Sequence, residues 1–326
     1  KAAILGAGFM GGLHSKNLAG MQDVSICAVC DIDEAAAKKL AAAHGAEPYT
    51  SLEKMLDEKK IDAVYICIPP YGHNGEFEKI ASHKKHIFIE KPIHLHFCKA
   101  KKMIEAAEKN KIFSQVGYQY RFGSAVKELK KRIDNGSAGK PVLFTATYQC
   151  NSLHAPWWRD KNTCGSQILE QVIHTYDLAM YLFGSPEKIS AYMSNICHTK
   201  DENYTIEDVS ASIVKFKNGA IGSVGASNCA IPMRWDNLFT VVYENLTAQF
   251  LNANEAVFTN TAGRIAGEVI NHKTEIDMYL DEDKYFIATL RGECENISTI
   301  KDGYDSLQFV DAVARSAESG GAPVSL

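Results

Sequence analysis

The chain of 326 residues has no long apolar run, no excess of positive charge and no low-complexity tract or Pro-rich linker. None of its apolar runs approaches the length of about 18 residues that a membrane helix needs, and the chain starts in a predicted strand rather than in a basic and apolar leader. The net charge of −4 leaves no basic footprint for nucleic acid or anionic lipid. We therefore expect a cytoplasmic protein with neither nucleic-acid nor membrane partners.

The nine cysteines are odd in number and scattered, as expected for small buried side chains in a reducing compartment. Cys27 and Cys30 have the spacing of a redox or zinc motif, but in a predicted strand residues three apart point to opposite faces. His94 and His96 lack further ligands at chelating spacing. The sequence therefore predicts no metal site.

The first third of the chain alternates between strand and helix patterns. The run 62–68 is continuously apolar and closed by two prolines, which is typical of a parallel strand buried on both faces. Such alternation predicts a doubly wound α/β sheet. Its strands are expected at 2–5, 25–30, 62–68, 86–90 and 113–117.

After Arg121 the pattern changes to segments of period two joined by turns. These segments predict a largely antiparallel sheet, with strands at 141–148, 189–193, 209–216, 220–226, 238–243 and 248–251. Helical patterns accompany them at 124–135, 166–183 and 304–318. Since so long a chain usually forms more than one core, we expect two domains, at residues 1–122 and 123–326.

A glycine-rich turn, Gly6-Ala7-Gly8-Phe9-Met10-Gly11, stands between the first strand and the first helix. This spacing is a dinucleotide fingerprint, in which a pyrophosphate lies on the helix N-terminus. Asp31 ends the second strand 20 residues after Gly11, where its carboxylate can accept hydrogen bonds from ribose hydroxyls. An acidic side chain repels a 2′-phosphate, so the sequence predicts that NAD is the cofactor and that NADP binds less well.

Two segments place polar groups at the rim where ligands bind, outside the carboxyl ends of parallel strands. Pro69 to His73 follow the third predicted strand, and Glu90, Lys91 and Pro92 follow the fourth. In the second domain, an apolar helix expected at 166–183 carries polar side chains. Glu170, His174 and Asp177 share one face of that helix, and buried ionisable groups are costly unless paired or used.

Taken in order, these motifs resemble the Gfo/Idh/MocA family of sugar and cyclitol oxidoreductases. The resemblance rests on the following segments: the opening strand and glycine turn with His14, Pro69 to His73, Glu90-Lys91-Pro92, Tyr120-Arg121-Phe122, Trp158-Arg159, His174 with Asp177, and Asp311 to Ala317. It implies an N-terminal Rossmann domain and a C-terminal α+β domain with an open sheet that builds oligomers, here a homodimer or homotetramer. It also implies a cis peptide bond between Lys91 and Pro92, and expected site residues in three roles.

The catalytic residues are expected to be Lys91, His174 and Glu170. Cofactor-binding residues are expected to be Gly6, Gly8, Phe9, Met10, Gly11, Asp31, Pro69, His73, Glu90 and Lys91. Substrate-binding residues are expected to be Lys91, Tyr120, Arg121, Trp158, Arg159, Glu170 and His174. His14 is expected to be structural, and Asp177 to orient its helix.

The chain departs from the family pattern at two places. Glu170 stands where the family usually has aspartate, and Cys164-Gly165-Ser166 replaces the usual three glycines. We expect an NAD-dependent dehydrogenase or reductase acting on a secondary hydroxyl of a sugar, sugar acid or cyclitol. His174 would remove the hydroxyl proton while Lys91 stabilises the developing alkoxide. The alternatives are a redox-neutral glycosidase or lyase that retains NAD, and a non-catalytic NAD sensor.

Overall fold

The computed structural model describes residues 1–151 and 155–326. They form two compact units: an N-terminal unit of residues 1–118 and 278–304, and a C-terminal unit of residues 119–277 and 305–326. Packing thus adds a late segment, 278–304, to the first unit. The functional division at residues 1–122 and 123–326 stays a prediction.

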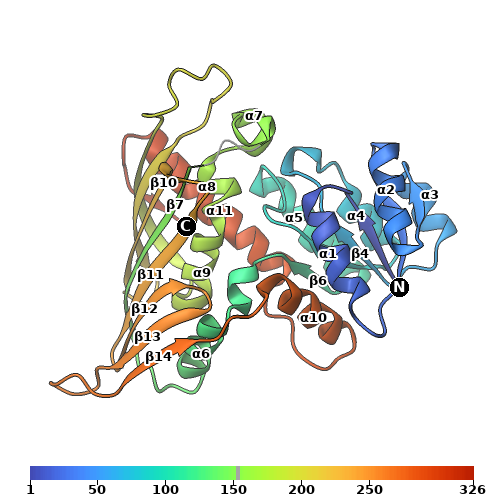
Figure 1. Ribbon diagram of the computed structural model, residues 1–326. Coiled ribbons are helices and arrows are strands. Elements are labelled where there is room, and N and C mark those ends of the chain that lie inside the picture. The colour runs from blue at the N-terminus through green and yellow to red at the C-terminus, as the bar shows by residue number, and fades with distance from the viewer. Residues whose placement is uncertain (152–154) are drawn as a thin grey trace. The chain divides into compact units, whose positions relative to one another are not determined.

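The N-terminal unit contains a six-stranded parallel sheet with the order β3-β2-β1-β4-β5-β6 (Figure 1). Its strands are β1 Ala2–Leu5, β2 Ile26–Cys30, β3 Glu47–Tyr49, β4 Ala63–Ile66, β5 His86–Ile89 and β6 Ser114–Val116. The order is that of a doubly wound nucleotide-binding sheet, with its switch point between β1 and β4. The predicted fold is confirmed here, while the short edge strand β3 had not been predicted.

The helices of this unit connect and cover the parallel strands. They are α1 Phe9–Ala19, α2 Glu34–His44, α3 Leu52–Glu58, α4 Glu76–Ser82, α5 Phe97–Asn110 and α10 Met278–Leu290, with a short 3₁₀ turn at Pro70–Gly72. Tyr65 of β4 stacks on Phe88 of β5 with ring centroids 4.7 Å apart, and Phe286 of α10 meets both rings at a steep angle. This aromatic contact in the core explains why α10 belongs to the first unit.

The C-terminal unit contains a nine-stranded sheet with the order β14-β13-β12-β11-β7-β10-β9-β8-β15. Every neighbouring pair is antiparallel except β7 and β10, so the prediction of a mostly antiparallel sheet is confirmed. The strands are β7 Pro141–Asn151, β8 Pro186–Ser194, β9 Val209–Phe216, β10 Ile221–Pro232, β11 Trp235–Tyr243, β12 Leu246–Asn252, β13 Glu255–Asn260, β14 Val269–Lys273 and β15 Val324–Ser325. The last three had not been predicted.

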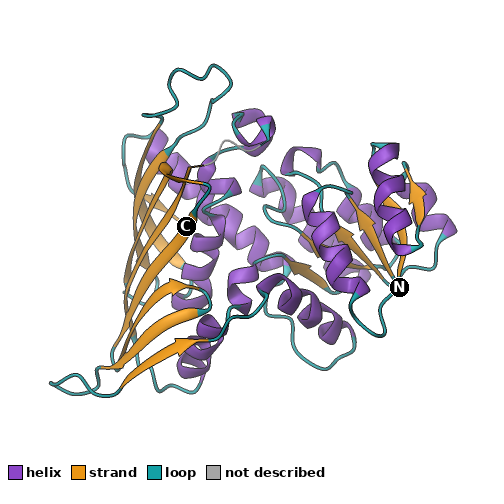
Figure 2. Cartoon of the chain, viewed as in Figure 1, coloured by secondary structure: helices purple, strands orange, loops and turns teal. Residues whose placement is uncertain are grey.

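Helices of the C-terminal unit lie against one face of this sheet (Figure 2). They are α6 Ser124–Asp134, α7 Lys161–Cys164, α8 Gln167–Glu170, α9 Ile173–Phe183 and most of α11 Ile300–Glu318, with 3₁₀ turns at Gln119–Phe122 and Pro156–Trp158. The first turn of α11, up to Tyr304, belongs to the N-terminal unit. Phe183 of α9 packs on Phe144 and Phe216 of the sheet. On β9 the side chains alternate: Ser212 is buried under the helices, whereas Ile213 is 62% exposed on the opposite face. No helix of the described residues is long and apolar enough to cross a membrane.

The prediction of one continuous helix at 166–183 was wrong. Helix α8 ends at Glu170, and α9 begins at Ile173. Between them the amide of Val172 donates to the carbonyl oxygen of Gln167, five residues back, which widens the turn as in a π-bulge. Because of this extra residue, Glu170 and His174 do not have the angular relation of an ordinary α-helix.

Candidate functional site

The glycine turn between β1 and α1 depends on missing side chains. Gly6 has φ +98°, and a Cβ there would lie 2.5 Å from the carbonyl oxygen of Cys67. A Cβ on Gly11 would lie 1.9 Å from the carbonyl oxygen of Gly6. Gly8 instead faces open space within 4 Å. Two glycines therefore permit the turn and the close approach of α1, and the third lets a ligand reach the backbone.

Asp31 is held against this turn from the end of β2. Its Oδ2 accepts a hydrogen bond from the amide of Ala7 at 2.6 Å, and its Oδ1 accepts one from Asp33 at 2.9 Å. Each carboxylate oxygen can accept a further hydrogen bond. The N-cap of α1, Gly8, has no side-chain cap, so the first amides of the helix suit an anion. These residues fit NAD, because the first amides of α1 suit a pyrophosphate and the carboxylate of Asp31 suits ribose hydroxyls.

Pro69 and His73 follow β4, at the edge of the sheet where ligands of such folds bind. His73 is buried, and its Nδ1 pairs with the carboxylate of Glu76. Burial tends to raise the pKa of Glu76, but the hydrogen bond and charge of His73 outweigh burial and lower it. The Nε2 of His73 is buried and has no hydrogen-bond partner among the described residues. A polar group of a ligand at this edge could supply that partner.

Lys91 lies two residues after the end of β5, and the peptide bond between Lys91 and Pro92 is cis, as the resemblance implied. The backbone amide of Lys91 donates to Oε2 of Glu90 at 3.1 Å. The other carboxylate oxygen of Glu90 accepts from Nε2 of His14 at 2.9 Å. Glu90 thus connects the backbone of the proposed catalytic lysine to helix α1.

His14 lies between two carboxylates in the interior of the N-terminal unit. Its side chain is fully buried, and its Nδ1 lies 2.8 Å from Oδ1 of Asp283 in α10. Asn17 donates to the other oxygen of Asp283 at 2.9 Å. Ligating atoms of His14, Glu90 and Glu282 all lie within 4.8 Å of one another. A positive charge on His14 would therefore reduce the repulsion among the carboxylates of Glu90, Glu282 and Asp283.

The protonation of His14 follows from these neighbours. Burial alone lowers the pKa of a histidine, but the hydrogen bonds and charges of Asp283 and Glu90 outweigh burial and raise the pKa of His14 to about 10. Burial raises the pKa of Asp283 although His14 opposes that shift. His14 is therefore an imidazolium at neutral pH. The resulting ion cluster fixes Glu90, and with it the start of the Lys91 segment.

In the C-terminal unit, His174 lies in the first turn of α9 beside Tyr120. Both the histidine and most of its helix are buried, and the two ring centroids are 5.1 Å apart. Burial raises the pKa of Tyr120 to about 12 despite a hydrogen bond with Asn237. Tyr120 is therefore a neutral phenol at physiological pH, able to donate a hydrogen bond beside the proposed base.

Arg121 forms a buried pair with Asp177, which lies on α9 three residues after His174. The guanidinium donates to both carboxylate oxygens, from Nη2 at 2.5 Å and from Nε at 2.8 Å. Ser306 of α11 donates to the same carboxylate at 3.1 Å. The face of Arg121 lies 4.7 Å from the ring centroid of Tyr181. This two-point pair holds α9 in place, which indicates a positioning role for Arg121.

Glu170 ends α8, close to two buried thiols. Burial raises the pKa of Cys150 to about 12, and the charge of Glu170 adds to that shift; the pKa of Cys164 is raised for the same two reasons. Glu207 accepts a hydrogen bond from the amide of Ile168 at 2.9 Å, at the start of α8. Burial raises the pKa of Glu207 to about 7. No spacing in the sequence had singled out Glu207, which holds α8 from a distant loop.

Trp158 and Arg159 lie in and after the 3₁₀ turn at Pro156–Trp158. Trp158 meets Trp157 nearly edge-on, with ring centroids 5.5 Å apart. The Nη1 of Arg159 lies 3.7 Å from a carboxylate oxygen of Asp201, and the carbonyl oxygen of Arg159 accepts from Thr205 at 2.8 Å. The loop around residues 201–205 therefore supports Arg159.

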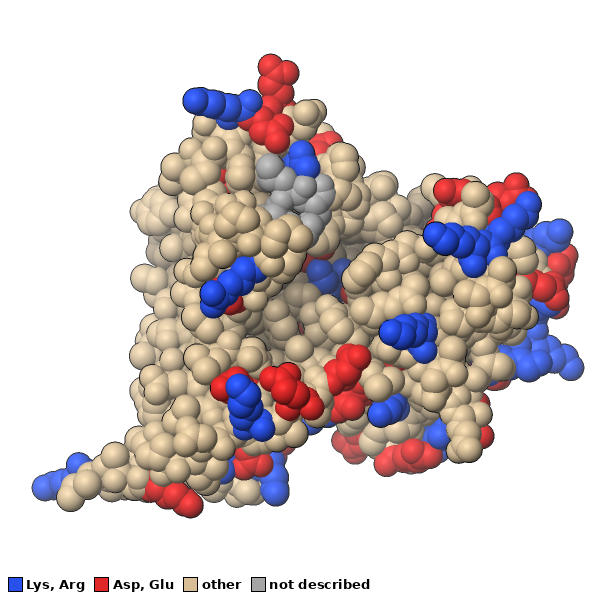
Figure 3. Space-filling view, in the orientation of Figure 1, with Lys and Arg blue, Asp and Glu red and all other residues tan. Residues whose placement is uncertain are grey.

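Two further features concern metals and surface charge. Cys27 and Cys30 both lie on β2, and within residues 1–151 and 155–326 neither they nor His94 and His96 join a group of three metal-ligating side chains. On the face drawn in Figure 3, basic and acidic side chains are interspersed.

Comparison with protein families identifies both parts of the chain. Residues 1–118 match the oxidoreductase family with an NAD-binding Rossmann fold, and residues 126–249 match the GFO/IDH/MocA C-terminal domain. The chain belongs to the Gfo/Idh/MocA oxidoreductase family, and its N-terminal part is an NAD-binding Rossmann domain.

Named relatives are dehydrogenases. The chain is 30% identical over 230 residues to scyllo-inositol 2-dehydrogenase (NAD(+)) of Bacillus subtilis (strain 168), covering 70% of this chain and 67% of the relative. It is 26% identical over 325 residues to myo-inositol 2-dehydrogenase of Thermotoga maritima, covering 98% of this chain and 96% of the relative. Levoglucosan dehydrogenase, solved with NADH and L-sorbose, superposes with a TM-score of 0.88 at 22% identity, covering 99% and 98% of the two chains, and shows the shared fold.

Proposed function

We propose that this protein is an NAD-dependent dehydrogenase or reductase that acts on a secondary hydroxyl of a sugar, sugar acid or cyclitol. The observation that carries the proposal is Lys91, which follows a strand of the same parallel sheet as the NAD-binding turn. Its backbone is anchored by the buried cluster of His14, Glu90 and Asp283. The inositol dehydrogenases among its relatives support the class of substrate.

The proposed chemistry divides the work between two side chains. Bound NAD would supply the hydride acceptor in the oxidative direction. His174 would remove the hydroxyl proton as a general base, and the ammonium of Lys91 would donate a hydrogen bond to the same oxygen as negative charge develops on it. The reaction requires both side chains to reach one substrate oxygen.

The remaining predicted residues would bind the substrate. Tyr120 is neutral beside His174 and can donate to a hydroxyl, while Trp158 and Arg159 offer an aromatic face and a charged donor. Glu170 would accept from a neighbouring hydroxyl. Arg121 is engaged by Asp177, so its contribution would be to hold the helix of His174 in place.

The test of this proposal is a screen of polyols, cyclitols and aminosugars with NAD. The absorbance of NADH and the release of any leaving group are recorded in parallel. The proposal requires net formation of NADH with at least one polyol or cyclitol. Turnover without NADH would favour the redox-neutral rival, and binding of NAD without any turnover would favour a sensor.

Glu170 separates the dehydrogenase from the redox-neutral glycosidase or lyase. In a dehydrogenase, Glu170→Gln should cause a moderate loss, because an amide still accepts hydrogen bonds. In the rival the change should be nearly fatal to elimination, because an amide transfers no proton at neutral pH. A loss confined to leaving-group release, with hydride transfer intact, would overturn the dehydrogenase proposal.

We also propose a cytoplasmic homo-oligomer that acts in carbohydrate metabolism. The nine cysteines are free thiols, which suits a reducing compartment.

The helix-free face of the large sheet exposes apolar side chains, and a second copy of the chain would cover them. They include Tyr192, Ile213, Ile221 and Leu238. Light scattering should show a dimer or tetramer. Ile213→Asp on this face should dissociate the oligomer into monomers.

A further inference from the structure

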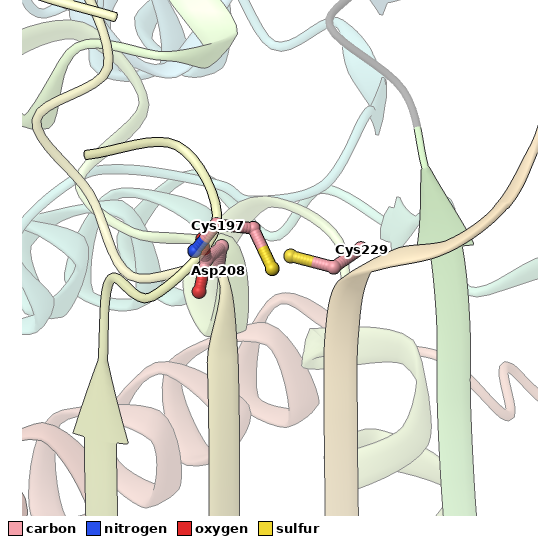
Figure 4. Close-up of side chains that lie close together, drawn as sticks. All are labelled: Cys197, Asp208 and Cys229. Atoms are coloured by element: carbon pink, nitrogen blue, oxygen red, sulfur yellow. The ribbon is translucent and has the colours of Figure 1, made fainter. Parts of the chain in front are cut away.

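Three neighbouring strands bring together two cysteines and an aspartate that are distant in sequence. Cys197 follows β8, Asp208 immediately precedes β9, and Cys229 lies on β10. Figure 4 shows the two sulfur atoms directed toward each other, with Asp208 beside them. Both sulfur atoms and a carboxylate oxygen of Asp208 lie within 4.8 Å of one another.

The backbone holds Asp208 in this position. Its carboxylate accepts hydrogen bonds from the amides of Ile196 at 2.9 Å, Cys197 at 2.7 Å and His198 at 3.0 Å. Its own carbonyl oxygen accepts from the amide of Asn228, next to Cys229, at 2.7 Å. Asp208 is therefore the link that places both cysteines, and the three side chains are positioned by the fold itself.

Two thiolates and a carboxylate are typical ligands of a zinc-class divalent cation. In a tetrahedral zinc site, bond lengths of about 2.0 to 2.3 Å place neighbouring ligand atoms about 3.5 to 3.8 Å apart. Because the three ligand atoms lie within 4.8 Å of one another, displacements of at most about 1 Å would bring them to these separations. Cys197 is exposed, so water can reach the site and serve as the fourth ligand.

We propose that Cys197, Asp208 and Cys229 bind one zinc-class divalent cation per chain. Binding releases one proton from each thiol and changes no oxidation state. A disulfide between the two cysteines would not require the carboxylate, whereas a cation uses it as a ligand. The bound ion would fasten the loop after β8 to β10. That loop continues to Asp201 and Thr205, which contact Arg159, so the cation would also steady a proposed substrate residue.

The experiment titrates the reduced, metal-free full chain with Co²⁺, which reports thiolate ligands by a charge-transfer band in the near ultraviolet, and then displaces it with Zn²⁺. We expect one cobalt per chain. Cys197→Ser and Cys229→Ser should each weaken binding at least tenfold. Asp208→Asn keeps an acceptor oxygen for the loop amides and should weaken binding while the thiolate band remains at saturating cobalt. The matched control is Cys98→Ser, an exposed cysteine on α5, which should bind as wild type does.

Three outcomes would overturn the proposal. The first is no charge-transfer band at any cobalt concentration. The second is a band that Cys197→Ser leaves unchanged, since another thiol would then hold the metal. The third is a Cys197–Cys229 disulfide found by mass spectrometry after air oxidation in a chain that binds no cobalt when reduced. Because metal content is measured without substrate, none of these outcomes bears on the proposed dehydrogenase activity.

Discussion

The two compact units contain buried ion pairs of similar layout but with different cations. In the N-terminal unit His14 lies between Glu90 and Asp283, and in the C-terminal unit Arg121 pairs with Asp177. Glu90 immediately precedes the proposed catalytic Lys91, and Asp177 follows the proposed base His174 by three residues. Each unit therefore contains a buried charge pair with one member within three residues of a proposed catalytic group.

Helices near the C-terminal end of the chain contribute to both charge pairs. The two pairs differ in their cation, which is a histidine in one and an arginine in the other. Helix α10 supplies Asp283, and α11 supplies Ser306 to the second pair. An arginine stays charged at every physiological pH, whereas a buried histidine is charged only because its acidic partners hold the proton. The segment before Lys91 is therefore held by a pair whose cation, His14, can lose its proton. The helix of His174 is held by a pair whose cation, Arg121, stays charged.

Removal of either cation should have the largest effect on stability. His14→Ala and Arg121→Ala each leave a buried carboxylate without its partner, so the free energy of unfolding should fall by about 3 to 5 kcal/mol. Urea unfolding at pH 7 measures the change. Lys131→Ala on α6, which removes an exposed cation, is the control and should change stability by less than about 0.5 kcal/mol. A loss as small as the control's would show that the buried pairs do not support their units.

Removal of the proposed catalytic groups should affect rate rather than stability. Lys91→Ala and His174→Ala should each lower turnover by roughly 10²-fold or more, about 2.7 kcal/mol, while NAD affinity changes only a few-fold. Steady-state kinetics and calorimetry measure the two quantities. A variant that keeps near-normal turnover in the chemical step would remove that residue from the mechanism.

The stabilisation by the His14 cluster should depend on pH, whereas that by the Arg121–Asp177 pair should not. The folded pKa of His14 is raised to about 10 from an ordinary 6.5, so the folded state holds a proton that the unfolded state loses. The stabilisation from this pair is complete below pH 6.5 and is lost as the pH rises toward 10. Between pH 7 and 9 it should decline by up to about 1.4 kcal/mol per pH unit.

Two measurements test this pH dependence. Urea unfolding at pH 7, 8 and 9 should show a steeper decline for the wild type than for His14→Gln, and Arg121 should contribute no such slope. NMR of the labelled histidines provides a readout without a variant, because one imidazole should stay protonated throughout pH 6 to 9. If every histidine titrates below pH 8, His14 is not held as a cation.

The choice between NAD and NADP should depend on the half-buried carboxylate of Asp31. We expect NAD to bind at least tenfold more tightly than NADP, a difference of about 1.4 kcal/mol. Asp31→Asn keeps an acceptor oxygen for the amide of Ala7 but removes the charge, so it should narrow the gap. Calorimetry measures the affinities for NAD and NADP. Equal affinities in the wild type would refute the role of Asp31.

Local patterns predicted the parts of the molecule that local chemistry controls. The apolar runs at the parallel strands, the glycine turn and Asp31 were all recognised, because each depends on residues within one βαβ segment. The widened turn at Val172 was missed, since the surrounding apolar residues suit an unbroken helix equally well. Strands β13 and β14 and helix α10 also went unpredicted.

The sequence by itself determined the class of fold and the NAD-binding turn, because periodicity and turn chemistry act over a few residues. It also marked Lys91 and His174 as candidates, through the lysine at a strand end, the polar helix face and the family resemblance, and their catalytic roles stay predictions. Only the tertiary structure decided how charges are paired. Asp283 meets His14 from 269 residues away, and Cys229 reaches Cys197 across two intervening strand pairings. Burial and long-range contacts set the protonation of such groups, and neither quantity is encoded in local spacing.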